Sequence, residues 1–562
     1  MKERYLDLID RAVEAYTEDH IARYTREVRE NGLTEHGYPR LTADIGILLA
    51  HGRHPERLAY FPDMMDLCCR EIPLASDRPA RAGNEFSVKE LIHCLQEVEA
   101  AGLLPGSVTE KWREKITAFR ARDIYYVIAP QPVERINNWA AFGAASEQTR
   151  LAMGVGGDPD FVENQIQSQL LSFDENGMYR DPHEPMVYDL VTRLQLALAL
   201  HEGYDGPGRA ALEDFMRRAA MPTLLMQSMT GEIPFGGRSN QFLHNETFYA
   251  ALCEFYAAWM HREGDDALAG QFRAAARLAA DSLDSWLAMK PVHHIKNRFP
   301  LDSRIGCEGY GYFDKYMVTM GSWAYLAYRF ADDSIPEVPC PAMTGGYAWQ
   351  TSAHFHKVIL SAGGYFAEFD TAADTHYDAS GLGRIHKKGA PSALALSVPF
   401  AENPSYTLPA PNPGPLAVAP GALTADGWQF GSSPEAVWTC VKTDSAADAA
   451  EAAFTCALPQ GPTLTLTARA DAGGVTLTVS GAPEVGFELP VFVSDGETAA
   501  ALAASPQAVT VTYAGHRARW STDVALADTG VDYVNRNGTY RRFTAQGAGT
   551  VTLRVQLTKT EE

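Results

Sequence analysis

The stretch IPFGGRSNQFLHNETFYAAL, residues 233–252, shows the pattern that decides the fold. Two glycines and a polar run, 238–241, lead through His244 into an apolar segment with the spacing of a helix. One Ser, Asp or Asn is enough to cap a helix, so this stretch carries more polar groups than a cap requires. The surplus indicates a functional loop placed directly before a buried helix.

The same pattern of a short polar loop followed by a mostly apolar helix recurs through the first 335 residues. It appears at about 31–51, 82–102, 137–154, 179–203, 236–262 and 309–330. More charged, one-sided segments lie between these, such as SVTEKWREKITAFRARDIYYVI at 107–128. A helix that is apolar on all sides must be buried, whereas a one-sided helix faces water. Six such pairs predict an (α/α)6 toroid over residues 1–335, with the polar loops converging at one mouth.

The pattern changes near residue 335. A proline-rich segment at 331–346 is followed by strict alternation of apolar and polar residues in TLTLTARADAGGVTLTVSG (463–481), AVTVTYAG (508–515) and VTLRVQLT (551–558). Alternation with period two is typical of half-buried strands. We therefore expect an antiparallel β-sandwich over residues 336–562, which makes the protein an α+β multidomain chain.

Composition narrows the classes of function. A chain of 562 residues needs more than one core, and a net charge of −22 argues against nucleic acid as a partner. No apolar run is long enough to cross a membrane, and the charged N-terminal stretch lacks the core of a signal peptide. Eight scattered cysteines show no disulfide or zinc spacing. We expect a cytoplasmic protein, although removal of a leader would leave the same appearance.

Four loops before the expected buried helices are rich in side chains that bind sugars. They contain Arg135 and Asn137 to Trp139, then Tyr179 to Asp189, then the opening stretch, then Glu308 to Tyr316. Amides, imidazoles, phenols, guanidinium groups and aromatic faces suit a carbohydrate, and a uronic acid also needs an arginine or amides at its carboxylate. Each residue also has a structural interpretation, as a helix cap, a core aromatic or a surface ion pair.

The second half of the chain adds a basic cluster. It comprises His376, Asp378, Arg384, His386 and Lys387, and the glycines at 381, 383 and 389 predict that it is a loop. We expect Arg384, His386 and Lys387 to bind substrate at the mouth, with a solvated basic loop as the alternative.

Histidines near the start of the second half indicate a metal site. His354 and His356 alternate with apolar residues and so are expected on one strand face, near His376 and Asp378. This set is a candidate site for a structural divalent metal. A histidine-lined sheet without metal is the alternative.

Three segments resemble a known family. NNWAAFG (137–143), ENGMYRDPHEPMVYDLV (175–191) and GGRSNQF (236–242) are similar to cleft segments of the (α/α) toroid polysaccharide lyases, the heparinase II/III-like, alginate and chondroitin/hyaluronate lyase group. The resemblance implies a carbon–oxygen lyase that cleaves uronic-acid-containing glycans by β-elimination without a required cofactor. It implies that His183 and Tyr188 are catalytic and that the segment with Arg238 lies at the cleft.

Under this mechanism the candidates are assigned as follows. The substrate-binding set is Asn138, Trp139, Arg238, Asn240 and Gln241; the candidate bases are His183 and His244; the candidate acids are Tyr188, Tyr310 and Tyr312. The expected substrate is an anionic oligosaccharide, and a cytoplasmic enzyme would take short imported chains in an exo fashion.

Two other classes of function stay open. A glycoside hydrolase needs two carboxylates, and candidates are Asp181, Glu184, Glu246, Glu308 and Asp314. A carbohydrate-binding protein without catalysis needs neither a pair of carboxylates nor a general base.

Overall fold

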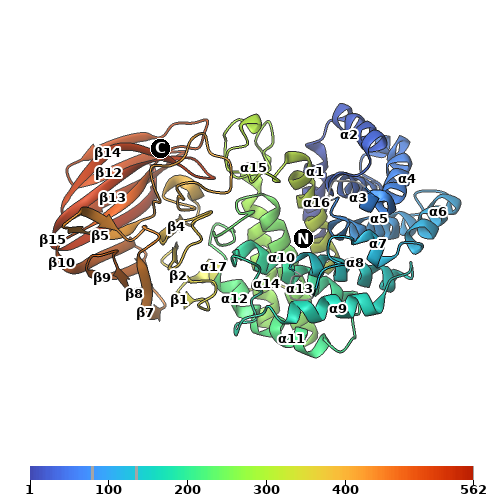
Figure 1. Cartoon of the computed structure of the whole chain (residues 1–562), viewed down its shortest axis with the longest axis horizontal. Coiled ribbons are helices and arrows are strands. Elements are labelled where there is room, and N and C mark those ends of the chain that lie inside the picture. Colours follow the sequence, from blue (N-terminus) through green and yellow to red (C-terminus); the bar gives the residue numbers. More distant parts are fainter. Residues whose placement is uncertain (78–81, 133–136, 561–562) are drawn as a thin grey trace.

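The structure is a computed structural model that describes residues 1–77, 82–132 and 137–560 (Figure 1). Its first part is helical. The longer helices are α1 (Lys2–Glu14), α2 (Glu18–Asn31), α3 (Gly37–Ala50), α4 (Phe61–Glu71), α5 (Val88–Ala100), α6 (Gly106–Thr117), α8 (Trp139–Met153), α9 (Pro159–Leu170), α10 (Met186–His201), α11 (Arg209–Arg218), α13 (His244–Arg262), α14 (Asp266–Ser282) and α16 (Phe313–Phe330). Short helices are α7 (Ala121–Ile124), α12 (Ala220–Leu225), α15 (Asp284–Leu287) and α17 (Pro341–Thr344). None of the described helices is both long and apolar enough to cross a membrane.

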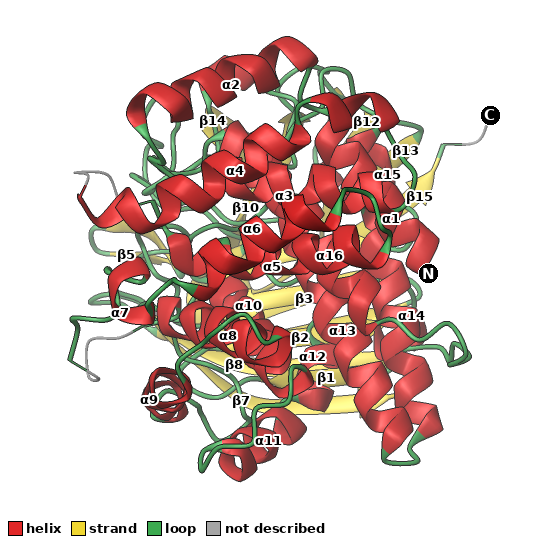
Figure 2. Ribbon diagram, turned by 90° about the vertical axis from the view of Figure 1, so that its right-hand side faces the viewer, coloured by secondary structure: helices red, strands yellow, loops and turns green. Residues whose placement is uncertain are grey.

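Helices α3, α5, α8, α10, α13 and α16 fall within the segments expected to be apolar and buried. In α13 all but a few residues are buried, whereas α2 buries one face through Ile21, Tyr24 and Val28. Each of the buried helices packs on the next along the chain, and α16 packs back on α3, so their contacts form a closed circuit. One-sided helices such as α2, α4 and α6 lie on the outside (Figure 2).

The second part consists of antiparallel strands. The smaller sheet has the order β1 (Tyr347–Gln350), β2 (Lys357–Ala362), β3 (Tyr365–Asp370), β4 (Gly381–Lys387). The larger sheet has the order β11 (Ala501–Ser505), β12 (Ala508–Tyr513), β13 (His516–Thr522), β15 (Thr539–Lys559), β10 (Gly474–Ser494), β9 (Thr463–Asp471), β8 (Ala449–Ala457), β7 (Val437–Ala446). In addition β14 (Ala525–Val534) pairs with β15, and β5 (Ala419–Thr424) pairs with β10 and with β6 (Gly427–Phe430).

The two sheets pack on each other through side chains that are buried at every second position of a strand. In β9 every second residue is buried, beginning with Leu464 and Leu466, as its sequence pattern predicts. Strands β2 and β3 of the smaller sheet pack on β8 and β9 of the larger one. The smaller sheet lies between the larger sheet and the helices (Figure 1). The predicted division at residue 335 falls between the end of α16 and the start of β1.

Two local expectations differ from the structure. The basic segment at 381–389 is not a glycine-rich loop, because its first seven residues form β4. Gly383 has a packing role there: a Cβ atom at this position would lie 2.4 Å from the Phe235 ring, so only glycine lets the helical part approach this strand. His354 and His356 precede β2 instead of lying on it, and His356 has a left-handed φ of 46°.

The buried Glu85, in the 3₁₀ turn Asn84–Phe86, makes stability depend on pH. Burial raises the pKa of Glu85 from 4.5 to about 7, so the folded protein binds this proton more tightly than the unfolded chain. The resulting stabilisation is complete below pH 4.5 and is lost as the pH rises to about 7, at about 1.4 kcal/mol per pH unit.

We therefore expect the melting temperature of the wild type, relative to Glu85→Gln, to fall between pH 4.5 and about 7 and to level off above. Differential scanning calorimetry across this range measures the difference. Glu30→Gln, on an exposed face of α2, is the control and should follow the wild type at every pH. A constant difference between Glu85→Gln and the wild type would contradict the assignment.

Candidate functional site

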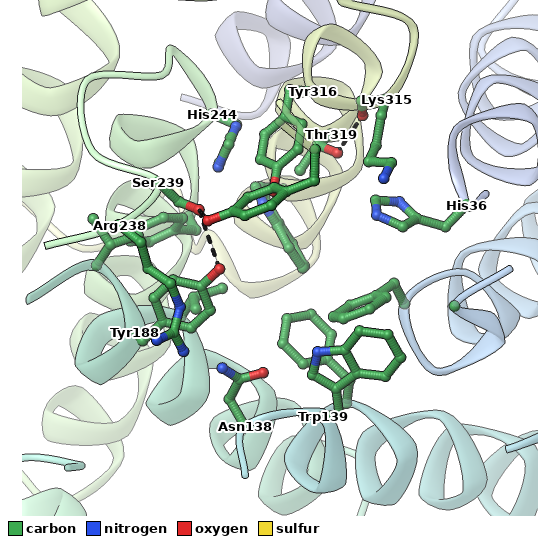
Figure 3. Close-up of a pocket in the computed structure, with 18 of the residues that line it drawn as sticks. His36, Asn138, Trp139, Tyr188, Arg238, Ser239, His244, Lys315, Tyr316 and Thr319 are labelled. Carbon is green, nitrogen blue, oxygen red and sulfur yellow. Dashed lines mark hydrogen bonds between the residues drawn. The ribbon is translucent and has the colours of Figure 1, made fainter. Parts of the chain in front are cut away.

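A cavity of about 410 Å³ lies where the loops before the buried helices meet (Figure 3). Its walls come from α3, α8, α10, α13 and α16 and from the loops before them. The described residues that line it are His36, Arg40, Gly83, Phe86, Asn137, Asn138, Trp139, Phe142, Val187, Tyr188, Val191, Arg238, Ser239, His244, Phe248, Tyr310, Lys315, Tyr316, Thr319 and Trp323. The position and size suit a small-molecule site.

Most of the loop residues singled out in the sequence meet in this cavity, namely Asn138, Trp139, Tyr188, Arg238, His244 and Tyr310. His183 and Tyr312 do not line it. His183 is exposed, and its Nδ1 lies 3.5 Å from Asp374. Tyr312 is also exposed and packs beneath the guanidinium of Arg304. Arg135 lies outside the described residues.

Asn240 and Gln241 are buried beside the cavity and hold the loop together. The Asn240 side chain donates to the Pro234 carbonyl at 3.0 Å, and Gln241 Nε2 donates to Asn240 Oδ1 at 2.6 Å. Gln241 Oε1 accepts a hydrogen bond from Asn537 at 3.0 Å. Their amide groups are thus paired within the protein, so the expected contact with a ligand is not available to them in this structure.

The basic residues of β4 lie inside the protein, away from the cavity. Arg384 is fully buried and donates to the carbonyls of Ser397 at 3.0 Å and Ile233 at 2.5 Å. Burial lowers the pKa of His386 to about 3, and the ring lies between Ser228 and Ser397. These side chains join the sheet to the helices because a strand packed between two layers has no solvated side.

Lys387, the last residue of β4, is also turned away from the cavity. Its Nζ donates to the Gly363 carbonyl at 3.0 Å and lies 3.9 Å from the centre of the Tyr365 ring. The expected reach of this segment over the mouth is therefore wrong for all three of its basic residues.

The loop at 236–241 has an unusual backbone. Gly236 and Gly237 have φ angles of 132° and 76°, and Ser239 and Gln241 have φ angles of 59° and 68°. Side chains other than glycine rarely adopt this left-handed region, and the surrounding structure must hold them there. A Cβ atom at Gly237 would lie 2.5 Å from Pro185, which explains the glycine. The conformation directs Arg238 and Ser239 into the cavity (Figure 3).

Carboxylates from both parts of the chain hold this loop. The Ser239 N–H donates to Glu308 at 2.6 Å, and the Gly237 N–H donates to Asp378 at 2.7 Å. Glu308 in turn forms a buried ion pair with Arg536, at 2.7 and 3.2 Å. Arg536 follows β14, so the sheet part of the chain contributes to the geometry of a cavity built from helices.

A chain of hydroxyl groups crosses one wall of the cavity. Ser239 Oγ lies 3.1 Å from the Tyr188 hydroxyl and 3.0 Å from the Tyr310 hydroxyl (Figure 3). Tyr310 is 37% exposed as a whole, but its hydroxyl lies in the cavity, where burial and Tyr188 raise its pKa. Tyr310 therefore stays protonated at neutral pH. The Arg238 guanidinium lies 4.2 Å from the centre of the Tyr188 ring.

Arg238 and Asn138 are held by one buried carboxylate. Asp181 accepts hydrogen bonds from the Asn138 backbone at 3.3 Å and side chain at 3.0 Å, and it pairs with Arg238. Burial raises the pKa of Asp181, and the charge of Arg238 opposes that shift. Asn138 Oδ1 is buried and has no hydrogen-bond partner among the described residues, so the amide retains capacity for a ligand.

His244 begins α13 and faces the cavity. Its ring stacks on Phe242 at 5.5 Å and lies 4.9 Å from the ring of Tyr316. Burial, reinforced by the positive charge of Arg40, lowers the pKa of His244 well below its usual value. The imidazole is therefore neutral at physiological pH, and its buried Nδ1 has no hydrogen-bond partner among the described residues.

His36 and Arg40 also line the cavity, although neither was among the predicted site residues; Ser239 and Lys315 line it too, and they lie in loops that were singled out without a role for either residue. Arg40 is 2% exposed and donates to His36 Nδ1 at 3.0 Å and to Thr319 at 2.6 Å. The sequence could have indicated His36 and Arg40, because they lie in the polar loop and the first turn of the expected segment 31–51.

No Asp or Glu lines this cavity among the residues that the structure describes. The carboxylates considered for hydrolysis all have partners within the protein: Asp181 pairs with Arg238 behind the cavity wall, Glu184 with His354, Glu246 with Lys296, Glu308 with Arg536 and Asp314 with His20. The described wall is made of cationic and uncharged side chains, and this composition favours an anionic ligand.

The expected metal ligands do not form a cluster in the described part of the chain. His356 pairs with Asp370, His376 with Asp374, and Asp378 accepts from Gly237, while His354 faces Glu184.

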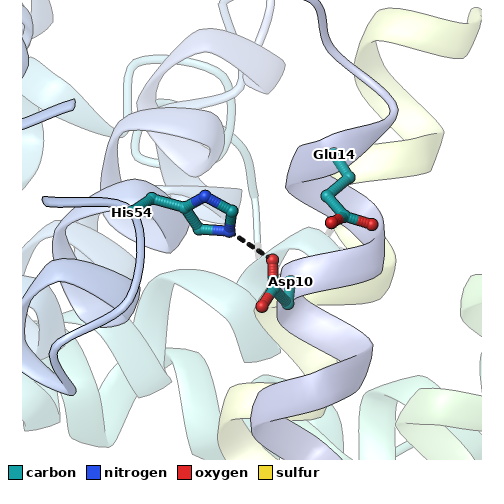
Figure 4. A group of neighbouring side chains, drawn as sticks. All are labelled: Asp10, Glu14 and His54. Carbon is teal, nitrogen blue, oxygen red and sulfur yellow. Dashed lines mark hydrogen bonds and ion pairs between the residues drawn. The ribbon is translucent and has the colours of Figure 1, made fainter. Parts of the chain in front are cut away.

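A different group, Asp10, Glu14 and His54, has ligand atoms within 4.8 Å of one another (Figure 4). His54 Nε2 lies only 2.5 Å from Asp10 Oδ1, and Arg53 also pairs with Asp10. Asp10 is therefore already paired within the protein, with His54 and with Arg53.

Comparison with known proteins gives remote similarities to solved structures only. No protein-family model matches the sequence, and no curated protein matches it. Among solved structures, heparan sulfate lyase HepC from Pedobacter heparinus is similar at 10% identity and a TM-score of 0.45, over 93% of this chain and 76% of that one. A chondroitinase AC lyase is similar at 9% identity and a TM-score of 0.38, over 98% and 83%.

A glycosyl hydrolase of family 88 from Bacteroides vulgatus is similar at 12% identity and a TM-score of 0.37, over 59% of this chain and 99% of that one. The solved structures found thus include a heparan sulfate lyase and a chondroitinase AC lyase, which belong to the group that the cleft segments of this chain resemble. At these identities and TM-scores the similarity carries no argument about the reaction.

The Arg536–Glu308 pair gives a prediction about stability. Arg536→Met leaves Glu308 buried without its cation, and breaking such a pair costs about 3–5 kcal/mol. We expect a clearly lower melting temperature by calorimetry. Arg541→Met is the matched control, because Arg541 pairs with Asp532 at the surface and such pairs contribute about 0–1 kcal/mol. Equal melting temperatures for the two variants would refute the importance of the buried pair.

Proposed function

We propose that the protein is a carbohydrate-active enzyme, a lyase that cleaves uronic-acid-containing oligosaccharides by β-elimination, on an (α/α)6 toroid followed by a β-sandwich. The observation that carries this proposal is the Tyr188–Ser239–Tyr310 chain of hydroxyls beside Arg238, facing a neutral His244. The substrate is an anionic oligosaccharide, and the reaction uses no cofactor.

The first requirement of β-elimination is to acidify the C5 proton of the uronate. Hydrogen bonds and positive charge at the carboxylate stabilise the negative charge that develops there. Arg238 and Asn138 are suited to this task because Asp181 holds both at one side of the cavity. The free Oδ1 of Asn138 is suited to accept from a sugar hydroxyl.

The second requirement is a base and an acid. In the proposed step the neutral His244 takes the proton from C5, and the electron pair of that C–H bond forms the C4–C5 double bond as the C4–O bond breaks. The Tyr310 phenol, kept protonated by its raised pKa, donates its proton to the leaving oxygen. Ser239 and Tyr188 are placed to return a proton to Tyr310 afterwards.

Aromatic side chains supply a surface for the sugar ring. Trp139 lines the cavity next to Phe86, with the two ring centres 4.7 Å apart. A pyranose ring presents C–H groups that pack on such faces. Hydrolysis is less well supported, because it needs two carboxylates at the bond and none is found in the described lining.

A product assay tests the reaction class. With a panel of uronate-containing tetrasaccharides, we expect a product with a carbon–carbon double bond that absorbs in the near ultraviolet. A new reducing end without that absorbance would indicate a hydrolase, and binding without any product would indicate a carbohydrate-binding protein.

Variants test the assigned groups. His244→Ala and Tyr310→Phe should each lower kcat by roughly 10²–10⁴-fold, the usual contribution of a general acid or base. Tyr312→Phe is the control, because Tyr312 lies outside the cavity and its hydroxyl should not matter. Near-normal turnover in both cavity variants, or a comparable loss of turnover in Tyr312→Phe, would refute the assignment of His244 as the base and Tyr310 as the acid.

A further inference from the structure

The side of the cavity away from Arg238 carries a second cationic group, Lys315. In Figure 3, Lys315 and His36 lie across the cavity from Arg238 and Tyr188. Lys315 Nζ makes no hydrogen bond or ion pair with any residue that the structure describes, and its recorded ring contact is to Tyr312, at 5.8 Å. Burial lowers the pKa of Lys315, which reflects the cost of holding this charge with little water around it.

The carboxylate that acts most strongly on Lys315 does not neutralise it. Glu35 raises the pKa of Lys315, but its own carboxyl accepts hydrogen bonds from the Gly37 N–H at 2.5 Å and from Tyr24. Burial raises the pKa of Glu35 to about 7, so near neutral pH it is only partly ionised. An ammonium group facing a cavity with no described carboxylate in its wall is therefore open to an anion from outside.

His36 adds an oriented donor beside Lys315. Arg40 Nη1 donates to His36 Nδ1 at 3.0 Å, so Nδ1 is the acceptor and the proton of the neutral ring is on Nε2. Burial and the charge of Arg40 lower the pKa of His36, which keeps the ring in this neutral form. The Nε2–H group is thus available as a hydrogen-bond donor.

Arg40 itself serves to hold this wall. Its guanidinium donates to Thr319 at 2.6 Å and to the Phe86 carbonyl at 3.0 Å, and Glu90 lies 3.4 Å from its Nε. These internal contacts leave Lys315 and His36 as the groups that can meet a ligand on this side.

We propose that Lys315 and His36 form a second anion-binding subsite, which receives a sulfate ester or a carboxylate on the sugar next to the uronate that is cleaved. This assignment rests on the proposed lyase function, because it takes Arg238 and Asn138 as the site of the uronate carboxylate. Trp139 lies between Asn138 and His36 in Figure 3, and Phe86 packs against it with the ring centres 4.7 Å apart, so the two rings are suited to pack on the sugar that joins the two anionic groups.

Binding titrations with three defined probes test the subsite by isothermal calorimetry; the wild type and each variant additionally carry Tyr310→Phe, so that the probes bind without being cleaved. The probes are an unsulfated glucuronate–N-acetylhexosamine tetrasaccharide, its 6-O-sulfated counterpart, and a tetrasaccharide made of uronates alone. We expect the sulfated probe, the all-uronate probe or both to bind roughly 10- to 100-fold more tightly than the unsulfated glucuronate–N-acetylhexosamine probe. A gain of this size is typical of one hydrogen bond to a charged group. Which of them binds tightly identifies sulfate or carboxylate as the second anionic group.

Lys315→Met should abolish this preference by weakening the tighter probe to the level of the unsulfated one. The matched control is Lys111→Met, which removes the same charge from an exposed position on α6 and should keep the preference of the wild type. His36→Gln, which retains an amide donor, should lower the preference less than His36→Ala.

The outcomes separate this subsite from the reaction itself. Equal affinity for all three probes, no binding of any probe, or a preference that survives in Lys315→Met would each overturn the subsite. If the ultraviolet-absorbing product still forms in those cases, the lyase proposal stands without it. If the preference is found as expected but no such product appears, the subsite stands as a property of the cavity and the reaction class is wrong.

Discussion

The buried ion pair between Arg536 and Glu308 is the constraint on which the cavity depends. Glu308 holds the Ser239 N–H, and Ser239 lies in a loop whose backbone angles cost energy unless neighbouring groups hold them. A buried ion pair is weak evidence for net stability, because both charges must be desolvated. Its clearer effect here is geometric: it couples a turn of the sheet region to the hydroxyl that joins Tyr188 and Tyr310.

The helices, the strands and part of the site could be predicted from the sequence because each has a local cause. Apolar residues on all sides of a segment require burial, which identified α13 and its counterparts. The polar loops that precede these helices must meet where the helices begin. Asn138, Arg238, His244 and Tyr310 come together for that reason.

The rest depends on partners that are distant in the sequence. Arg384 was predicted to lie on a loop and to bind substrate at the mouth, but Phe235 and Ile233 from the helical region pack on its strand and exclude water from it. Nothing near Arg536 in the sequence indicates that its partner lies more than two hundred residues earlier. His183 illustrates the converse, since a histidine in a promising loop turns toward solvent.

The contact between β4 and the loop before α13 has a consequence for how such a protein can change over generations. Arg384 donates to the Ile233 carbonyl, and Asp378 accepts from the Gly237 N–H, so side chains of the sheet region hold the backbone of the loop before α13. Recombination that exchanged the sheet region for a foreign one would leave these backbone groups without partners. The two regions therefore depend on each other for their shape, and we expect new specificity to arise by point substitution within the cavity instead of by shuffling of modules.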